Sequence, residues 1–194
     1  ESLPGTHIAL LASPAGAALA PHLPMIDECI EFEAPWVKSR ADDDAPGATE
    51  AALVERLRRG RYDAAIVFTV CTQSALPAAL LCRLAGIPLR LAHSRENPYR
   101  LLTDWVRDPD LPLASARHEV QRQLDLVAAV GLRAEGDDRL RLSYRADDAH
   151  TMRARFAAAG GDLRRPYFVV HPGATAPSRR WPSERYGEAA RVDR

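Results

Sequence analysis

Short apolar runs alternate along this chain with stretches of helical periodicity. The apolar runs predict strands at residues 7–12, 28–33, 62–69, 88–92, 140–143 and 167–171. The run at 28–33 alternates with period two, as in a half-exposed edge strand. The run at 62–69 is almost continuously apolar, which is typical of a central strand buried on both faces.

Helices are predicted between these runs, at residues 49–60, 74–86, 118–131, 147–160 and 182–191. Gly60, Gly86 and Gly131 stand where helix-terminating glycines belong. Strand and helix in succession imply right-handed crossovers and a mostly parallel sheet. The expected fold class is therefore α/β, with a Rossmann-like parallel sheet. The stretch 93–114 is rich in Pro, Arg and Asp, and we predict a long loop there.

Composition narrows the class of protein. The 194 residues are 46% apolar and carry 26 basic and 26 acidic side chains, which excludes disorder and argues against a general nucleic-acid binder. Of the basic residues only Lys38 is a lysine. Cys29, Cys71 and Cys82 form no CxxC pair, so we expect free thiols. The histidines have no metal-binding spacing, and no apolar run is long enough to cross a bilayer, so we expect no metal and no transmembrane segment.

Ligands of such sheets bind at the carboxyl ends of the strands, which directs attention to the loops at 69–73, 93–97 and 171–180. The last of these contains Gly173, Thr175, Arg179 and Arg180, followed by Trp181-Pro182 and a helix. Glycine allows close backbone approach, and guanidinium groups pair with phosphate oxygens. This loop is either a phosphate site or an ordinary strand-to-helix connection in an Arg-rich chain. Walker, G-x-G-x-x-G and G-x-S-x-G motifs are absent.

Three segments in order carry a family resemblance. Residues 167–189, Y-F-V-V-H-P-G-A-T-A-P-S-R-R-W-P-S-E-R-Y-G-E-A, resemble the opening of the C-terminal domain of family 9 glycosyltransferases, the lipopolysaccharide heptosyltransferases. Residues 61–90 resemble that family's YD-x-x-I strand, its Q-S loop and the helix ending LAGIPLR. Residues 118–131 resemble its H-x-V-x-x-x-L-x-L helix.

The resemblance implies a GT-B enzyme, with two Rossmann-like domains facing a cleft. Residues 1–163 would form the N-terminal acceptor domain, and residues 164–194 the first βα unit of the nucleotide-sugar domain. The donor would be ADP-heptose and the acceptor a lipopolysaccharide core sugar at the inner membrane surface of a bacterium. Transfer would be inverting, in the cytoplasm, without metal or cofactor. Thr175 and Arg179 match the residues that contact the donor phosphates, with Arg179 where the family commonly has lysine.

One departure from the family concerns the catalytic base. The family's first strand leads into a G-D-x-x-x-x-T-P loop that carries a catalytic Asp, and this chain has no such motif. The resemblance therefore implies that the first βα unit and most of the donor domain lie outside these residues. We expect this chain to be inactive alone, and its catalytic residue is unknown.

Acceptor-side candidates come from the loops after the predicted strands. Gln73 and Ser74 follow the strand at 62–69, although Ser74 also suits a helix cap. Arg95 and Arg100 either bind an anionic acceptor or belong to a solvated loop. His118 suits a helix cap and Trp181 a packing anchor. Two rival functions stay open: a non-catalytic Rossmann-like binding domain, and another GT-B enzyme such as a nucleotide-sugar epimerase.

Overall fold

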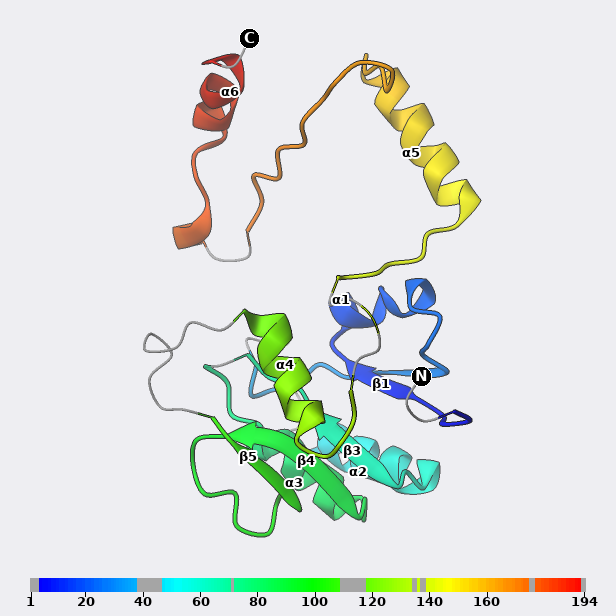
Figure 1. Cartoon of the computed structure of the whole chain (residues 1–194), viewed down its shortest axis with the longest axis vertical. Helices are drawn as coiled ribbons and strands as arrows, with labels where there is room; N and C mark the ends of the chain where they lie inside the picture. Colours follow the sequence, from blue (N-terminus) through cyan, green and yellow to red (C-terminus); the bar gives the residue numbers. More distant parts are fainter. Residues whose placement is uncertain are drawn as a thin grey trace. The chain divides into compact units, whose positions relative to one another are not determined.

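The computed structural model of the chain describes residues 4–37, 47–70, 72–108, 118–133, 136, 139–174 and 177–192. It forms two compact units, 1–143 and 144–194 (Figure 1). The domain boundary that we predict between residues 163 and 164 stays a prediction, because a division by packing does not test which domain a segment belongs to. None of the described helices is both long and apolar enough to span a membrane.

The first unit begins with a two-stranded parallel sheet. Strand β1 (Ala9–Ala12) pairs in register with β2 (Glu28–Glu31), so that the strands predicted at 7–12 and 28–33 both form. The crossover between them contains α1 (Pro14–Ala17) and the 3₁₀ turn η1 (Ala20–His22). Ser13 caps α1 by accepting the Gly16 N–H at 3.3 Å.

A second, three-stranded parallel sheet has the order β3-β4-β5, with β3 at Ala64–Val67, β4 at Leu89–Ser94 and β5 at Asp104–Arg107. The prediction that the 62–69 run is the central strand is wrong. Among the described strands β3 pairs with β4 alone, whereas β4 lies between two strands and is buried along most of its length. The loop predicted at 93–114 contains β5, a strand too short and too charged at its ends to give a recognisable period.

Helices cover the sheets as the sequence pattern predicts. Helix α2 (Ala48–Gly60) buries the predicted stripe of Leu53, Val54 and Leu57, and α3 (Leu76–Leu84) packs beside it. These helices and β2 share the main core, formed by Ile30, Phe32, Leu53, Val54, Leu57, Leu81, Cys82, Ala85 and Ile87. A further helix of this unit, α4 (Glu119–Ala128), contacts β4.

Gly60 does not end α2 in the way we predict. It lies inside the helix, and Arg61 adopts the left-handed conformation instead, with φ 51°. A Cβ on Gly60 would stand 2.4 Å from the ring of Tyr62. Glycine is therefore required by the close approach of Tyr62, whose hydroxyl donates to Glu28 of β2 at 2.8 Å.

The second unit consists of α5 (Ala146–Ala158), the 3₁₀ turn η2 (Pro177–Arg179) and α6 (Ser183–Val192). The strand predicted at 167–171 does not form, nor does the one at 140–143 in the first unit. Val169 is 82% exposed and Leu140 89% exposed. No described strand pairs with either segment, so neither has the backbone partners that a strand needs.

Burial of α4 gives a stability prediction. Leu126 is fully buried, whereas Leu140 is 89% exposed. We expect Leu126→Ala to lower the free energy of unfolding by about 2–5 kcal/mol, through lost burial and the cavity left behind. Leu140→Ala is the matched control and should change it by less than about 0.5 kcal/mol. Urea unfolding of both variants checks this, and equal effects would contradict the packing of α4.

Candidate functional site

Polar side chains gather at the carboxyl edge of the β3-β4-β5 sheet. Thr69 follows β3, Ser94 ends β4 and Asp108 follows β5. The indole Nε1 of Trp105 donates to the Ser94 carbonyl at 2.8 Å, which joins β4 and β5 at this edge. In parallel sheets this is the edge where ligands bind.

A buried ion pair closes the edge from the side of α4. The Arg122 guanidinium donates twice to Asp108, from Nη2 to Oδ2 at 2.8 Å and from Nε to Oδ1 at 3.4 Å. Both side chains are less than one tenth exposed. Arg122 Nη1 also donates to the Thr69 carbonyl and to Glu119 Oε1. One guanidinium therefore connects β3, β5 and α4.

The charges of this pair reinforce each other. Burial by itself would raise the pKa of Asp108, but the hydrogen bond and charge of Arg122, helped by His93 and Arg95, hold that pKa below its ordinary value. Burial would likewise lower the pKa of Arg122, yet Asp108 and Glu119 raise it. Both groups thus stay ionised in the folded state at neutral pH.

The acceptor-side candidates separate into two groups. Ser74 donates its hydroxyl proton to Glu96 Oε1 at 2.6 Å and accepts the Leu76 N–H at 3.2 Å. It thus satisfies the first N–H of α3, whose N-cap position is Ala75, and meets the loop after β4. Arg95 belongs to the same edge, because its charge lowers the pKa of Asp108. Gln73, whose N–H bonds to the Val70 carbonyl at 2.9 Å, lies in the loop beside Ser74.

Arg100 lies elsewhere, at the amino end of β4. Its carbonyl accepts hydrogen bonds from Arg83 Nη1 at 3.0 Å and from Arg90 Nη2 at 3.4 Å. The buried Arg90 guanidinium also donates to the carbonyls of Ile87, Pro88 and Leu101. The structure therefore brings Gln73, Ser74 and Arg95 to one edge and leaves Arg100 at the other.

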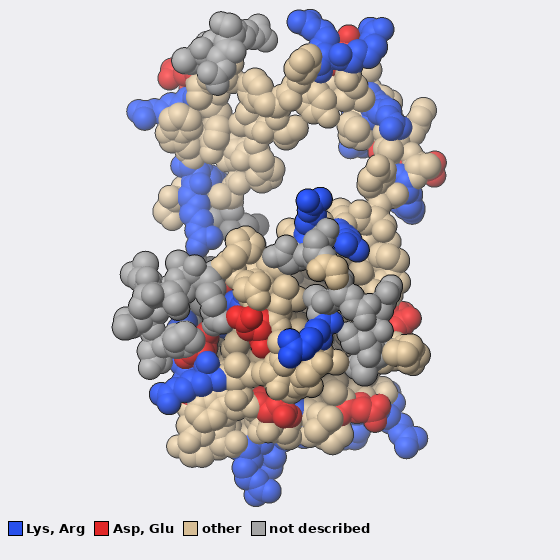
Figure 2. Space-filling view, viewed as in Figure 1, with Lys and Arg blue, Asp and Glu red and all other residues tan. Residues whose placement is uncertain are grey.

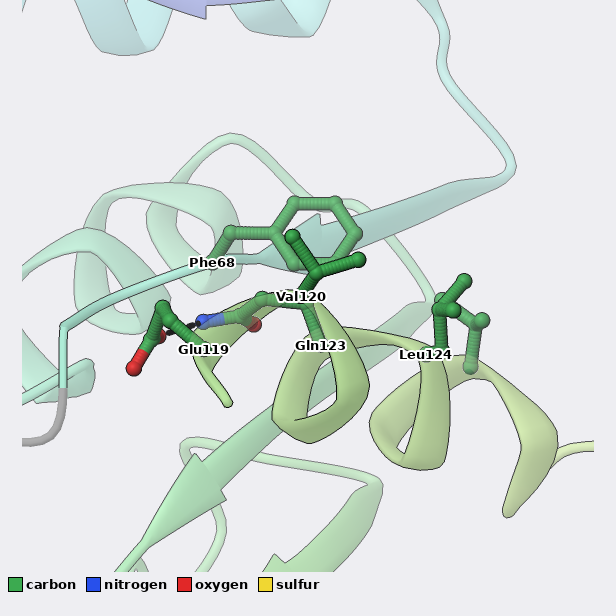
Figure 3. A pocket seen from close by; sticks show the side chains of 6 residues that line it. Phe68, Glu119, Val120, Gln123 and Leu124 are labelled. Carbon is green, nitrogen blue, oxygen red and sulfur yellow. Dashed lines mark hydrogen bonds between the residues drawn. The ribbon is translucent and has the colours of Figure 1, made fainter. Parts of the chain in front are cut away.

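An open apolar groove of about 300 Å³ adjoins the Arg122 site (Figure 3). Phe68, at the end of β3, faces Val120 and Gln123 of α4 across it, and Leu124 and Val127 continue the apolar wall. Glu119 lies at one end, where its carboxylate accepts a hydrogen bond from Gln123.

The predicted phosphate loop lies in the second unit. Arg180 Nε donates to the Ala174 carbonyl at 2.6 Å, and its N–H bonds to the Pro177 carbonyl at 3.0 Å, which closes η2. Arg179 is exposed, and the structure gives its side chain no partner among the residues described. Gly173 is described, but Thr175 lies outside the described residues.

Two neighbouring predictions concern packing and capping. Trp181 packs edge-on against Tyr186, with ring centroids 5.2 Å apart, but it is 45% exposed, so that its role as a packing anchor stays a prediction. His118 caps α4 through Nδ1, which accepts the Val120 N–H at 3.3 Å, as predicted.

The described cysteines and potential metal ligands do not form a site. In the ranges that the structure describes, no three His, Cys, Asp or Glu side chains lie together as a metal site would need. Cys29 and Cys82 are free, and burial raises the pKa of the Cys82 thiol. Cys71, Lys38 and residues 109–117 lie outside the described residues. Over the first unit, basic and acidic side chains are interspersed on the face shown in Figure 2.

The parallel βα arrangement and its polar carboxyl edge define the class, an α/β protein with Rossmann-like parallel sheets. The sequence model described as glycosyltransferase family 9 (heptosyltransferase) matches residues 50–193, and the chain belongs to this family. Among curated proteins none matches.

Two solved structures are similar to the chain over 98% of its length. The ADP-heptose lps heptosyltransferase II of E. coli has a TM-score of 0.66 and 25% identity, with 53% of that chain covered. The family 9 glycosyl transferase of Veillonella parvula has a TM-score of 0.68 and 16% identity, with 51% covered. The chain thus spans about half the length of these structures, and their parallel α/β architecture confirms the predicted fold class.

Sequence reasoning missed Asp108, Arg122 and His93. A signal for Arg122 was present: it follows His118 by one helical turn and precedes Leu126 by another, so it falls on the inward face of α4. A charged residue in that position requires a buried partner. The sequence does not say that Asp108 supplies it.

The buried pair predicts an acid-sensitive contribution to stability. Because the folded pKa of Asp108 lies below its ordinary value, the contribution is present above about pH 4 and is lost as the pH falls through the folded pKa. Asp108→Asn should cost about 3–5 kcal/mol at pH 7, since a buried cation loses its partner. The difference in free energy of unfolding between the variant and the wild type should become smaller towards pH 3.

Urea unfolding at both pH values measures this difference. The control is Asp162→Asn, which removes an exposed partner of Arg164 and should leave stability within about 0.5 kcal/mol of wild type. A cost for Asp108→Asn that does not change with pH would contradict the assignment.

Proposed function

We propose that the complete product of this gene transfers heptose from ADP-heptose to a lipopolysaccharide core acceptor, with inversion and without a metal ion. The observation that carries the proposal is the family match over residues 50–193, together with the similarity to a structure titled as an ADP-heptose heptosyltransferase. The reaction would take place in the cytoplasm, at the inner membrane surface.

The donor side of the proposal rests on the loop around η2. Transfer without a metal needs cations and N–H groups to stabilise the leaving diphosphate. Arg180 is engaged with the Ala174 carbonyl and so shapes the loop. Arg179 is exposed and therefore accessible to a phosphate. Gly173 and Thr175 complete the set that we propose for the donor phosphates.

The acceptor side rests on the carboxyl edge of the first unit. Gln73, Ser74 and Arg95 lie there, and Arg95 supplies a positive charge suited to an anionic core sugar. Inversion also needs a base on the acceptor hydroxyl. We assign no residue of this chain to that role.

A transfer assay tests the function. The complete gene product, incubated with ADP-heptose and a heptose-free lipopolysaccharide core, should release ADP and add one heptose to the acceptor, as measured by mass spectrometry. EDTA should leave the rate unchanged. Transfer from a different sugar nucleotide would overturn the donor assignment. Epimerisation of the donor, or no turnover, would support the rival functions instead.

A second experiment addresses the donor loop. In the complete gene product, Arg179→Ala should weaken binding of the ADP-sugar about tenfold or more, because a charged hydrogen bond contributes roughly 1.5–3 kcal/mol. Isothermal calorimetry measures the affinity. Arg164→Ala, which removes an exposed arginine paired with Asp162, is the matched control. Unchanged affinity in Arg179→Ala would remove this residue from the donor site.

A further inference from the structure

The Thr69 carbonyl, just beyond the end of β3, is bound by two side chains of a distant helix. Arg122 Nη1 and Gln123 Nε2 of α4 both donate to it, the latter at 2.9 Å. A backbone carbonyl after a strand usually bonds to backbone or water, so two adjacent side-chain donors from one helix fix its direction unusually firmly.

Both donors are themselves held in place. Arg122 is 5% exposed and is oriented by its two hydrogen bonds to Asp108. His93 Nε2 lies 3.0 Å from the Arg122 carbonyl and donates to it, which fastens the first turn of α4 to β4. Gln123 is braced by Glu119 one turn earlier. Arg122 and Gln123, which together form what we call the Thr69 clamp, are therefore held in position by other residues of the protein, without a ligand.

The Thr69 carbonyl lies a few residues before two acceptor-side candidates, Gln73 and Ser74. The Gln73 N–H bonds to the Val70 carbonyl, and Ser74 bonds to Glu96 in the loop after β4. Ser74 is thus held by Glu96, and Thr69 by the two donors of α4. These two attachments bound Val70, Thr72 and Gln73, and so orient these residues at the ligand edge.

We propose that Arg122 and Gln123 are positioning residues for the acceptor: they clamp the Thr69 carbonyl and thereby set the direction in which Gln73 and Ser74 face the substrate. This inference rests on the proposed function. It adds to it a pair of residues on α4 that act through the backbone of another element and need not touch either substrate.

The clamp explains two features that packing alone leaves unexplained. Gln123 lines an open groove and is only half-buried, so it adds little to the core. Its side-chain amide nevertheless donates a hydrogen bond to a backbone carbonyl. Arg122 engages Thr69 in addition to a carboxylate that already satisfies its charge.

Gln123→Leu is the decisive variant, because it removes one clamp donor and leaves the Arg122–Asp108 pair intact. In the complete gene product we expect it to raise the KM for the core acceptor about fivefold, with the KM for the sugar nucleotide within about twofold of wild type. Arg122→Lys keeps the positive charge but loses the planar guanidinium, whose separate nitrogens reach Asp108 and Thr69 at once. It should raise the acceptor KM about tenfold or more.

Gln121→Leu provides the matched control. It is the same substitution on the same helix, at an exposed residue whose amide donates to Asp125, and it should leave both KM values within about twofold of wild type. Hydrogen exchange supplies the second readout: the amides of Val70 and of residues 72–74 should exchange faster in Gln123→Leu, while those of β4 keep their protection.

The outcomes separate the two proposals. An inactive wild-type protein overturns the proposed function, whereas an active wild type with an unchanged acceptor KM in Gln123→Leu overturns the clamp. Equal rises in both KM values, with a lowered melting temperature, would also overturn it, because that pattern reports general loosening of the fold.

Discussion

The buried pair of Arg122 and Asp108 is the interaction on which the carboxyl edge of the sheet depends. Burying two charges is costly unless every polar atom finds a partner, and here the guanidinium serves a carboxylate, a carbonyl and a second carboxylate at once. The pair ties the end of β5, the end of β3 and the first turns of α4 together. The chain segments that follow β3 and β5 are thus both attached to the same guanidinium.

The sequence predicts the parts of this fold that depend on local pattern. The stripe of Leu53, Val54 and Leu57 predicts which face of α2 is buried, and the His118 cap and Gly131 bound α4 closely. It fails where an outcome depends on a distant partner. The 62–69 run looks central because it is apolar, but a strand's place in a sheet is decided by its neighbours. Runs 140–143 and 167–171 have strand-like composition and no described partner to pair with.

In the candidate site, too, the sequence predicts what depends on local pattern and misses what depends on a distant partner. Gln73, Ser74 and Arg95 were found because they follow predicted strands, and the rule that ligands bind at carboxyl ends needs only the order of elements. Arg100 was grouped with them because the stretch 93–114 looked like a single loop. Because β5 lies in that stretch and runs parallel to β4, the connection between them crosses from the carboxyl edge, where β4 ends, to the amino edge, where β5 begins. Arg95 lies at the start of this connection and Arg100 further along it. The Thr69 clamp was invisible, because its donors lie 53 and 54 residues further along the chain.

Arg90 and Arg122, the buried arginines among the described residues, lie at opposite ends of β4, and the chemical groups that accept their hydrogen bonds differ. Arg90 at the amino end is held by carbonyl oxygens, which take up no proton at any pH that a cell meets. Arg122 at the carboxyl end is held by a carboxylate, which takes up a proton only in strong acid, because Arg122 keeps the pKa of Asp108 below its ordinary value. Strong acid therefore removes the charge that holds the arginine at the carboxyl end of β4. The arginine at the amino end keeps its carbonyl partners under the same conditions, so that the two ends of one strand respond differently to protons.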